Sequence, residues 1–205
     1  DVYTLIRDKS GNKRSLHDFA KAFFGVNDGD WGTLTYTRAD IVSTLNKIEP
    51  YDWESFFKTR VDNVAPKAPL AGIERGGYRL VYGDTPNGVW RDGEVRSRAA
   101  NLLYSIGLSA DQNGKITLIQ WKGPSWKAGL NTSMTITGVN GQAYSSDRLR
   151  AAVAATKNGT PVDLLFRIGE TFKTVRIDYN GGHRYPRLER IEGKPAYLDD
   201  IIAPR

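Results

Sequence analysis

The sequence predicts an α+β protein in which a short helical segment precedes a β-rich part. Residues 1–64 carry apolar side chains at the three- and four-residue spacing of amphipathic helices. Residues 65–76 contain two Pro and two Gly and have no helical period, so we expect a linker there. From residue 77 onward apolar side chains alternate with a period of two, as in β-strands.

Three helices are expected in the first segment. Ser15, Thr37 and Asp52 stand where apolar repeats begin, and their side-chain oxygens can accept hydrogen bonds from the free N–H groups of a first helical turn. Gly25 and Pro50 end the first two helices. The aromatic side chains of these helices need a surface to pack against, so we expect the segment to be the end of a larger helical domain.

The β-rich part is expected to contain short strands, turns and two helical stretches. Residues 123–130 have Pro near their start and Gly near their end, which suits one helical turn. A longer helix is expected to begin at Ser145 or Ser146 and to stop at the Asn-Gly pair of residues 158–159. The expected strands cover residues 78–82, 102–110, 115–121, 134–139, 161–168 and 171–179.

The charge pattern and the short apolar runs of the chain exclude two classes of partner. The formal net charge is +6, and residues 101–181 hold nine basic and five acidic residues. These cations are scattered singly, whereas a nucleic-acid surface shows clustered Lys and Arg, so we expect no nucleic-acid partner. No apolar run approaches the roughly 20 residues that span a bilayer, so we expect no membrane insertion.

The absence of Cys and the presence of two His limit the chemistry of the chain. Without Cys there is no disulfide, no thiolate zinc site and no Cys nucleophile. His17 and His183 fit no metal-ligand spacing, and a catalytic zinc normally takes three protein ligands. We therefore expect no metal, no other cofactor and no catalytic residue in this chain.

Residues 103–179 resemble a PDZ domain in three motifs that follow in order. These are SIGL at 105–108, GPSWKAGL at 123–130 and ITGVNG at 136–141. The sequence NTSM at 131–134 departs from the family, which usually has Gly-Asp or Gly-Met there. The resemblance implies a PDZ-like β-barrel capped by two helices, with a groove that takes a peptide as an added strand.

The resemblance also implies which residues bind the peptide. Backbone N–H groups of Ile106, Gly107 and Leu108 would converge on a carboxylate. The side chains of Ile106, Leu108 and Ala152 would line the pocket for the terminal residue. Arg148 could select a polar or acidic side chain, although a solvated helix residue is the favoured interpretation. The candidate peptide-binding residues are Ser105, Ile106, Gly107, Leu108, Arg148 and Ala152.

The whole chain resembles the C-terminal third of the PDZ-containing glycyl aminopeptidases, zinc metallopeptidases with a thermolysin-like catalytic domain. The motifs are SLHDF at 15–19, GIERGGYRLVY at 72–82, YPRLERI at 185–191 and APR at 203–205. The His-Glu-x-x-His motif of such enzymes is absent here. The resemblance therefore implies that zinc belongs to the catalytic domain of a parent protein, and that this chain is a fragment without activity of its own.

These observations predict a domain organisation. Residues 1–64 would be the helical end of the catalytic domain and 65–76 a linker. Residues 77–181 would be the PDZ-like domain with an N-terminal strand extension, and 182–205 a tail that packs on it.

Three functions remain open at this point. The PDZ-like module would bind peptide or protein C-termini, or its own catalytic domain, and so guide substrates or support the peptidase. Alternatively, the chain would be a free-standing peptide-binding adaptor. A third possibility is a structural module whose groove is filled by residues 84–100 or 182–205. The compartment stays open, although a secreted or periplasmic bacterial protein is favoured.

Overall fold

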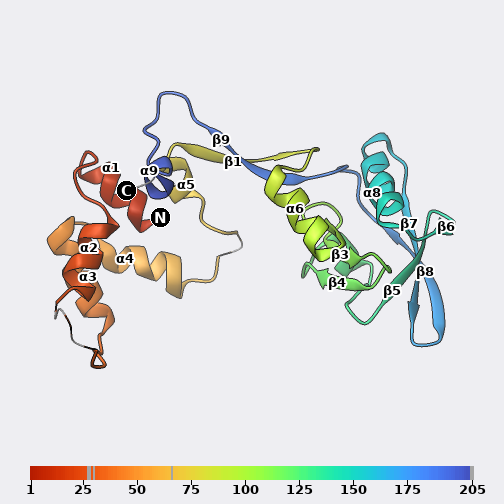
Figure 1. The fold of residues 1–205 in the computed structure, drawn as a ribbon, viewed down its shortest axis with the longest axis horizontal. Helices are drawn as coiled ribbons and strands as arrows, with labels where there is room; N and C mark the ends of the chain where they lie inside the picture. The colour runs from red at the N-terminus through yellow and green to blue at the C-terminus, as the bar shows by residue number, and fades with distance from the viewer. Residues whose placement is uncertain (27–28, 30, 66, 204–205) are drawn as a thin grey trace. The chain divides into compact units, whose positions relative to one another are not determined.

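The computed structural model describes residues 1–26, 29, 31–65 and 67–203 (Figure 1). The predicted linker includes position 66, and the predicted tail includes positions 204 and 205, which lie outside the described residues. None of the described helices combines the length and the apolar character needed to cross a membrane.

The chain divides into two compact units. Residues 1–80 together with 188–205 form the first unit, and residues 81–187 form the second. The chain enters the second unit through β1 (Tyr78–Gly83) and leaves it through β9 (Tyr185–Arg190). These two strands pair with each other as a two-stranded sheet.

The first unit is helical, as predicted for its N-terminal part. The side-chain oxygens of Ser15, Thr37 and Asp52 accept backbone N–H groups at the starts of the second, third and fourth helices. In two of these helices an Asp three residues further on, Asp18 or Asp40, accepts the N–H of the capping residue in return. The helices are α1 (Val2–Lys9), α2 (Leu16–Phe24), α3 (Arg38–Ile48), α4 (Trp53–Phe57), a π-helical turn (Lys58–Asp62), α5 (Ala71–Arg75) and α9 (Asp199–Ile202).

The core of the first unit is small. Leu5, Ile6, Leu45 and Trp53 are buried together. The Trp53 indole N–H donates to the Glu49 carbonyl at 2.9 Å, so the ring is buried without an unpaired donor. Helix α2 contributes only partly buried apolar side chains to this core.

The second unit contains two antiparallel sheets and three helices longer than three residues. One sheet has the order β2-β3-β4 and the other the order β6-β5-β7-β8. The elements are α6 (Gly88–Ser97), β2 (Ala99–Leu102), β3 (Leu108–Asp111), β4 (Ile116–Ile119), α7 (Pro124–Lys127), β5 (Thr135–Val139), β6 (Gln142–Ala143), α8 (Ser146–Ala155), a 3-10 turn (Thr156–Asn158), β7 (Val162–Ile168) and β8 (Thr171–Ile177).

The predicted β-barrel is wrong. Among the described residues the strands form three separate sheets, and none of them closes on itself. The two larger sheets meet through an isolated bridge between Lys115 and Thr135. Beside it, the Ile136 N–H donates to the Gly114 carbonyl at 2.8 Å, and a Cβ at Gly114 would lie 2.1 Å from the Ile136 oxygen. The strands are therefore joined at one short contact instead of along a full ladder.

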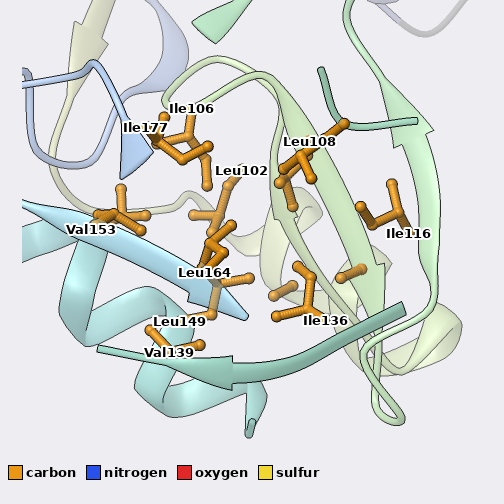
Figure 2. Packing of buried hydrophobic residues seen from close by; sticks show 14 of the residues in the cluster. Leu102, Ile106, Leu108, Ile116, Ile136, Val139, Leu149, Val153, Leu164 and Ile177 are labelled. Atoms are coloured by element: carbon orange, nitrogen blue, oxygen red, sulfur yellow. The ribbon is translucent and has the colours of Figure 1, made fainter. Parts of the chain in front are cut away.

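The two sheets and α8 enclose the core of the second unit (Figure 2). Leu108 and Ile116 come from the first sheet, Ile136 and Leu164 from the second, and Leu149 from α8. Each of these side chains is almost completely buried. Removal of apolar surface from water contributes roughly 25 cal/mol per Å², so this cluster is the main stabilising feature of the unit.

Candidate functional site

The candidate site lies at the loop of residues 103–107, which joins β2 to β3. The expected continuous strand over 102–110 is wrong, because the chain turns here and Gly107 adopts a φ of +77°. The Ile106 carbonyl accepts the N–H of Ser125 at 2.9 Å and its hydroxyl at 2.6 Å. These two bonds fix the loop to the start of α7.

Strand β2 lies along the edge of β3 that the resemblance predicts to receive a peptide. The two strands are antiparallel, and Leu102 stands opposite Leu108 while Ala100 stands opposite Ala110. The other edge of β3 pairs with β4. Both edges of β3 are therefore occupied by strands of the same chain.

The end of β2 engages backbone N–H groups of the loop. The Leu102 carbonyl oxygen accepts the N–H of Ser105 at 3.0 Å and that of Gly107 at 3.1 Å. The expected carboxylate donors were the N–H groups of Ile106, Gly107 and Leu108. One of these, Gly107, thus donates to the chain's own carbonyl, together with Ser105.

The predicted pocket residues and Leu102 lie in one hydrophobic cluster. Ile106 and Leu108 are fully buried, and Ala152 of α8 is 8% exposed. Leu102 belongs to the same cluster and points into it (Figure 2). The structure therefore places Ile106, Leu108 and Ala152 in the same buried cluster as Leu102.

Side chains from two helices satisfy the outer edge of β2. Glu94 of α6 accepts the Asn101 N–H at 2.7 Å, and Arg150 of α8 donates to the Ala99 carbonyl at 3.3 Å. Glu94 and Arg150 also form an ion pair at 3.4 Å. Polar backbone groups on both sides of β2 thus have partners, which stabilises a strand placed between a sheet and a helix.

Arg148 lies apart from this cluster. It is exposed in the first turn of α8, and its N–H donates to the Ser145 hydroxyl that caps the helix. Its guanidinium group donates to the Ala143 carbonyl at 2.6 Å. The described contacts of Arg148 are therefore with its own loop and helix, and its predicted role in peptide selection stays a prediction.

The described residues do not fit a zinc site. No group of three or more His, Cys, Asp or Glu among them could hold a metal ion. The His183 Nε2 lies 2.8 Å from the Arg150 carbonyl, and its Nδ1 lies 3.1 Å from the Tyr185 hydroxyl. Burial, and then the negative charge of Glu94, raise the pKa of Tyr185. His17 packs edge-on against the Tyr3 ring.

Strand β2 and the two side chains that hold it were not predicted from the sequence. Residues 84–100 were considered as an occupant of the groove, and the strand that lies along β3 begins at Ala99. A weak signal was present, because three of the four residues 99–102 are apolar and they stand directly before the loop. Glu94 and Arg150 carry no motif, and only the folded chain brings them together.

The comparisons with known proteins give a match to a solved structure. No protein-family model and no curated protein matches this chain. The chain is similar to the crystal structure of an aminopeptidase N family protein from Idiomarina loihiensis, with a TM-score of 0.55 and 14% sequence identity. The match covers 99% of this chain and 34% of that protein, so this chain spans about a third of the length of the protein it matches. At this identity the likeness shows the fold.

Proposed function

We propose that this chain is a non-catalytic part of a larger peptidase. The structural likeness to an aminopeptidase N family protein extends over nearly the whole chain but over only a third of that protein. The chain also lacks a His-Glu-x-x-His motif, and its described residues form no metal-ligand cluster. From the family resemblance we further propose that the parent uses zinc and removes N-terminal Gly or Ala.

We propose that the second unit is a PDZ-related support module whose groove is filled by its own strand. The observation that carries this proposal is the Leu102 carbonyl, which accepts two N–H groups of the loop while β2 lies along β3. A free peptide would have to displace β2 before it could pair with β3. This favours a structural role over substrate guidance by peptide capture.

The exposed apolar side chains of the first unit support its role as part of a larger domain. Phe24, Trp31, Tyr36 and Val64 are exposed by half or more. A contiguous exposed apolar patch usually marks a surface that another segment or protein covers, and the Phe24 and Tyr36 rings both contact the Phe23 ring. We propose that the catalytic domain of the parent covers them.

A peptide titration tests the filled groove. A tetrapeptide with the β2 sequence Ala-Ala-Asn-Leu and a free carboxylate is titrated against the whole chain, with the C-terminally amidated peptide as the control. We expect no saturable binding of either peptide. Tight binding of the free acid but not of the amide would show that β2 leaves the groove, and would favour the peptide-binding adaptor instead.

An activity assay tests the non-catalytic role. The pure chain should not hydrolyse glycine p-nitroanilide and should hold no stoichiometric zinc after dialysis. Hydrolysis by the pure chain that a chelator abolishes would overturn this part of the proposal. The titration and the assay fail independently, since one concerns the groove and the other the missing catalytic residues.

A further inference from the structure

A cavity of about 300 Å³ opens beside the loop that joins β2 to β3. We call it the aromatic cavity, and its lining includes Tyr82, Tyr104, Trp121, Lys122 and Arg184. A volume of this size suits a small organic ligand. The lining does not include Ile106, Leu108 or Ala152, so the aromatic cavity is distinct from the pocket that the PDZ resemblance predicts.

The aromatic side chains of this cavity present their rings to solvent. Trp121 is 69% exposed, Tyr104 43% and Tyr82 40%. The Tyr82 and Tyr104 ring centroids are 5.8 Å apart, and those of Trp121 and Trp126 are 6.1 Å apart. Clustered, half-exposed aromatic rings are typical of ligand-binding surfaces, because they offer a large contact area at little cost in conformational entropy.

Two cations rest on these rings. The Arg184 guanidinium carbon lies 4.4 Å from the centre of the Tyr82 ring, and the Lys122 ammonium lies 4.2 Å from the centre of a Trp121 ring. No Asp or Glu lines the aromatic cavity, and within the described part of the chain neither cation forms an ion pair. The local positive charge is therefore uncompensated, which favours an anionic ligand.

The backbone around Arg184 is fixed before any ligand arrives. The Arg184 N–H donates to the Ser105 hydroxyl oxygen at 3.0 Å, which attaches this segment to the loop. The Tyr179 hydroxyl donates to the Gly182 carbonyl at 2.8 Å, two residues before Arg184. A cation on an ordered backbone loses less entropy when it binds an anion, so these bonds favour binding.

We propose that the aromatic cavity binds a ligand in which a carboxylate adjoins an aromatic ring. Lys122 and Arg184 would bind the carboxylate, and the exposed face of Trp121 would stack on the ring. Two sources supply this chemistry: a free aromatic carboxylate, and the C-terminal aromatic residue of a peptide. The proposal does not depend on the role of β2 or on the parent peptidase.

Nuclear magnetic resonance of the whole chain tests the ligand class. The probe is N-acetylphenylalanine, and the readout is the indole N–H signal of Trp121, assigned from a Trp121→Phe variant. We expect a saturable shift of this signal. N-acetylphenylalaninamide, without the carboxylate, should bind about tenfold more weakly, since a charge-assisted hydrogen bond is lost. N-acetylalanine, without the ring, should also bind more weakly. Absence of a saturable shift, or equal binding of the acid and the amide, would overturn the proposal.

Charge variants test the site itself. Arg184→Gln and Lys122→Gln should each weaken the binding of N-acetylphenylalanine about tenfold. Arg184→Gln keeps the backbone N–H that donates to Ser105, so the loop stays in place. Lys173→Gln, which removes an exposed cation of β8 outside the cavity, is the matched control and should leave binding unchanged. If all three variants bind equally well, or all lose affinity equally, the site is wrong.

A third arm distinguishes the two sources of the ligand. The peptide Ala-Ala-Ala-Phe with a free carboxylate is titrated beside N-acetylphenylalanine. Tighter binding of the peptide identifies a peptide C-terminus as the ligand, and equal or weaker binding identifies a free aromatic carboxylate. Either result supports the proposed site only if Arg184→Gln weakens the binding of the ligand concerned.

Discussion

The two units of this protein bury their apolar side chains in different ways. In the second unit, strands and a helix from distant parts of the sequence enclose residues such as Ala100, Ile106 and Leu149, which are fully buried. In the first unit, helices that follow one another bury a small core, while Trp31 and Val64 are 97% and 100% exposed. The first unit is organised by local signals and the second by long-range strand pairing.

The comparison separates local signals, which determine where helices begin, from tertiary packing, which stabilises them. Caps at Ser15, Thr37 and Asp52 determine where helices begin, but isolated short helices gain most of their stability from tertiary packing. The described first unit supplies little of that packing to α2. In the second unit, even the short strand β2 has hydrogen-bond partners on both edges.

The largest effect is expected at the main buried ring of the first unit. Trp53→Ala should lower the free energy of unfolding of that unit by about 3–5 kcal/mol, because it removes a 1% exposed side chain from a small core. Trp31→Ala, at a 97% exposed ring in the same unit, is the control and should change stability by less than about 0.5 kcal/mol. Urea denaturation measures both. Equal losses would mean that the exposed ring has a partner within the first unit.

A comparable test applies to strand β2 of the second unit. Leu102→Ala should cost the second unit about 2–4 kcal/mol, because it leaves a cavity in the cluster with Ile106 and Leu108. Hydrogen exchange should also quicken in residues 99–102, since β2 loses its main side-chain anchor. Leu118→Ala on β4, where the side chain is 52% exposed, is the control. Unchanged exchange in Leu102→Ala would show that the backbone contacts hold β2 without the side chain.

The two carboxylates that pair with Arg150 should differ in energy. Glu94→Gln should destabilise the second unit by about 1–3 kcal/mol, because it removes the charge of an 11% exposed side chain that pairs with Arg150 and weakens the charge-assisted hydrogen bond from the Asn101 N–H. Asp147 is the other ion-pair partner of Arg150, and the Asp147 side chain is 96% exposed. Asp147→Asn should therefore lower the free energy of unfolding by less than about 1 kcal/mol. Thermal unfolding of the two variants checks the order. The reverse order would contradict the conclusion that Glu94 stabilises β2 through its hydrogen bond with Asn101.

The smallest effect concerns acid and the helix caps of the first unit. Hydrogen bonds from Thr37 lower the pKa of Asp40 below its ordinary value of 3.8, and those from Ser55 lower the pKa of Asp52 in the same way. Since both folded values lie below the unfolded ones, this stability is fully present above the ordinary Asp range. It is lost as the pH falls through the folded values.

The double variant Asp40→Asn, Asp52→Asn checks this expectation. Melting temperatures measured between pH 5 and pH 2 should fall less steeply for the double variant than for the wild type. Asp147→Asn, an exposed carboxylate outside these caps, is the control and should follow the wild-type slope. Identical slopes for all three proteins would show that the caps do not cause the acid sensitivity.

Local chemistry made much of the fold predictable. The caps of α2, α3 and α4, the Pro at the start of α7 and the hairpin of β7 and β8 all follow from short sequence signals. The strand pattern over 102–110 hid the turn at Gly107, and only the PDZ resemblance of residues 105–108 indicated a loop there. The predicted barrel was wrong because closure of a barrel depends on which strand edges pair, and the residue types of the strands do not specify this pairing.

The candidate site was less predictable than the fold. The burial of Ile106 and Leu108 follows from their apolar character. The pairing of β2 with β3 and the contacts of Glu94 and Arg150 with β2 join residues that are up to about fifty positions apart. Such contacts depend on the packing of α6 and α8, which the sequence does not specify residue by residue.

The covalent attachment of β2 has a quantitative consequence for any competitor. A segment tethered to its site by a loop of a few residues has an effective concentration of about 1 mM, even if the loop is flexible. If β2 fills a peptide groove as proposed, and if its untethered segment and a free peptide each have an intrinsic dissociation constant of about 1 μM, the peptide binds about a thousandfold more weakly than it would to an empty groove. A cell would need millimolar peptide to fill the groove, unless another event first withdrew β2.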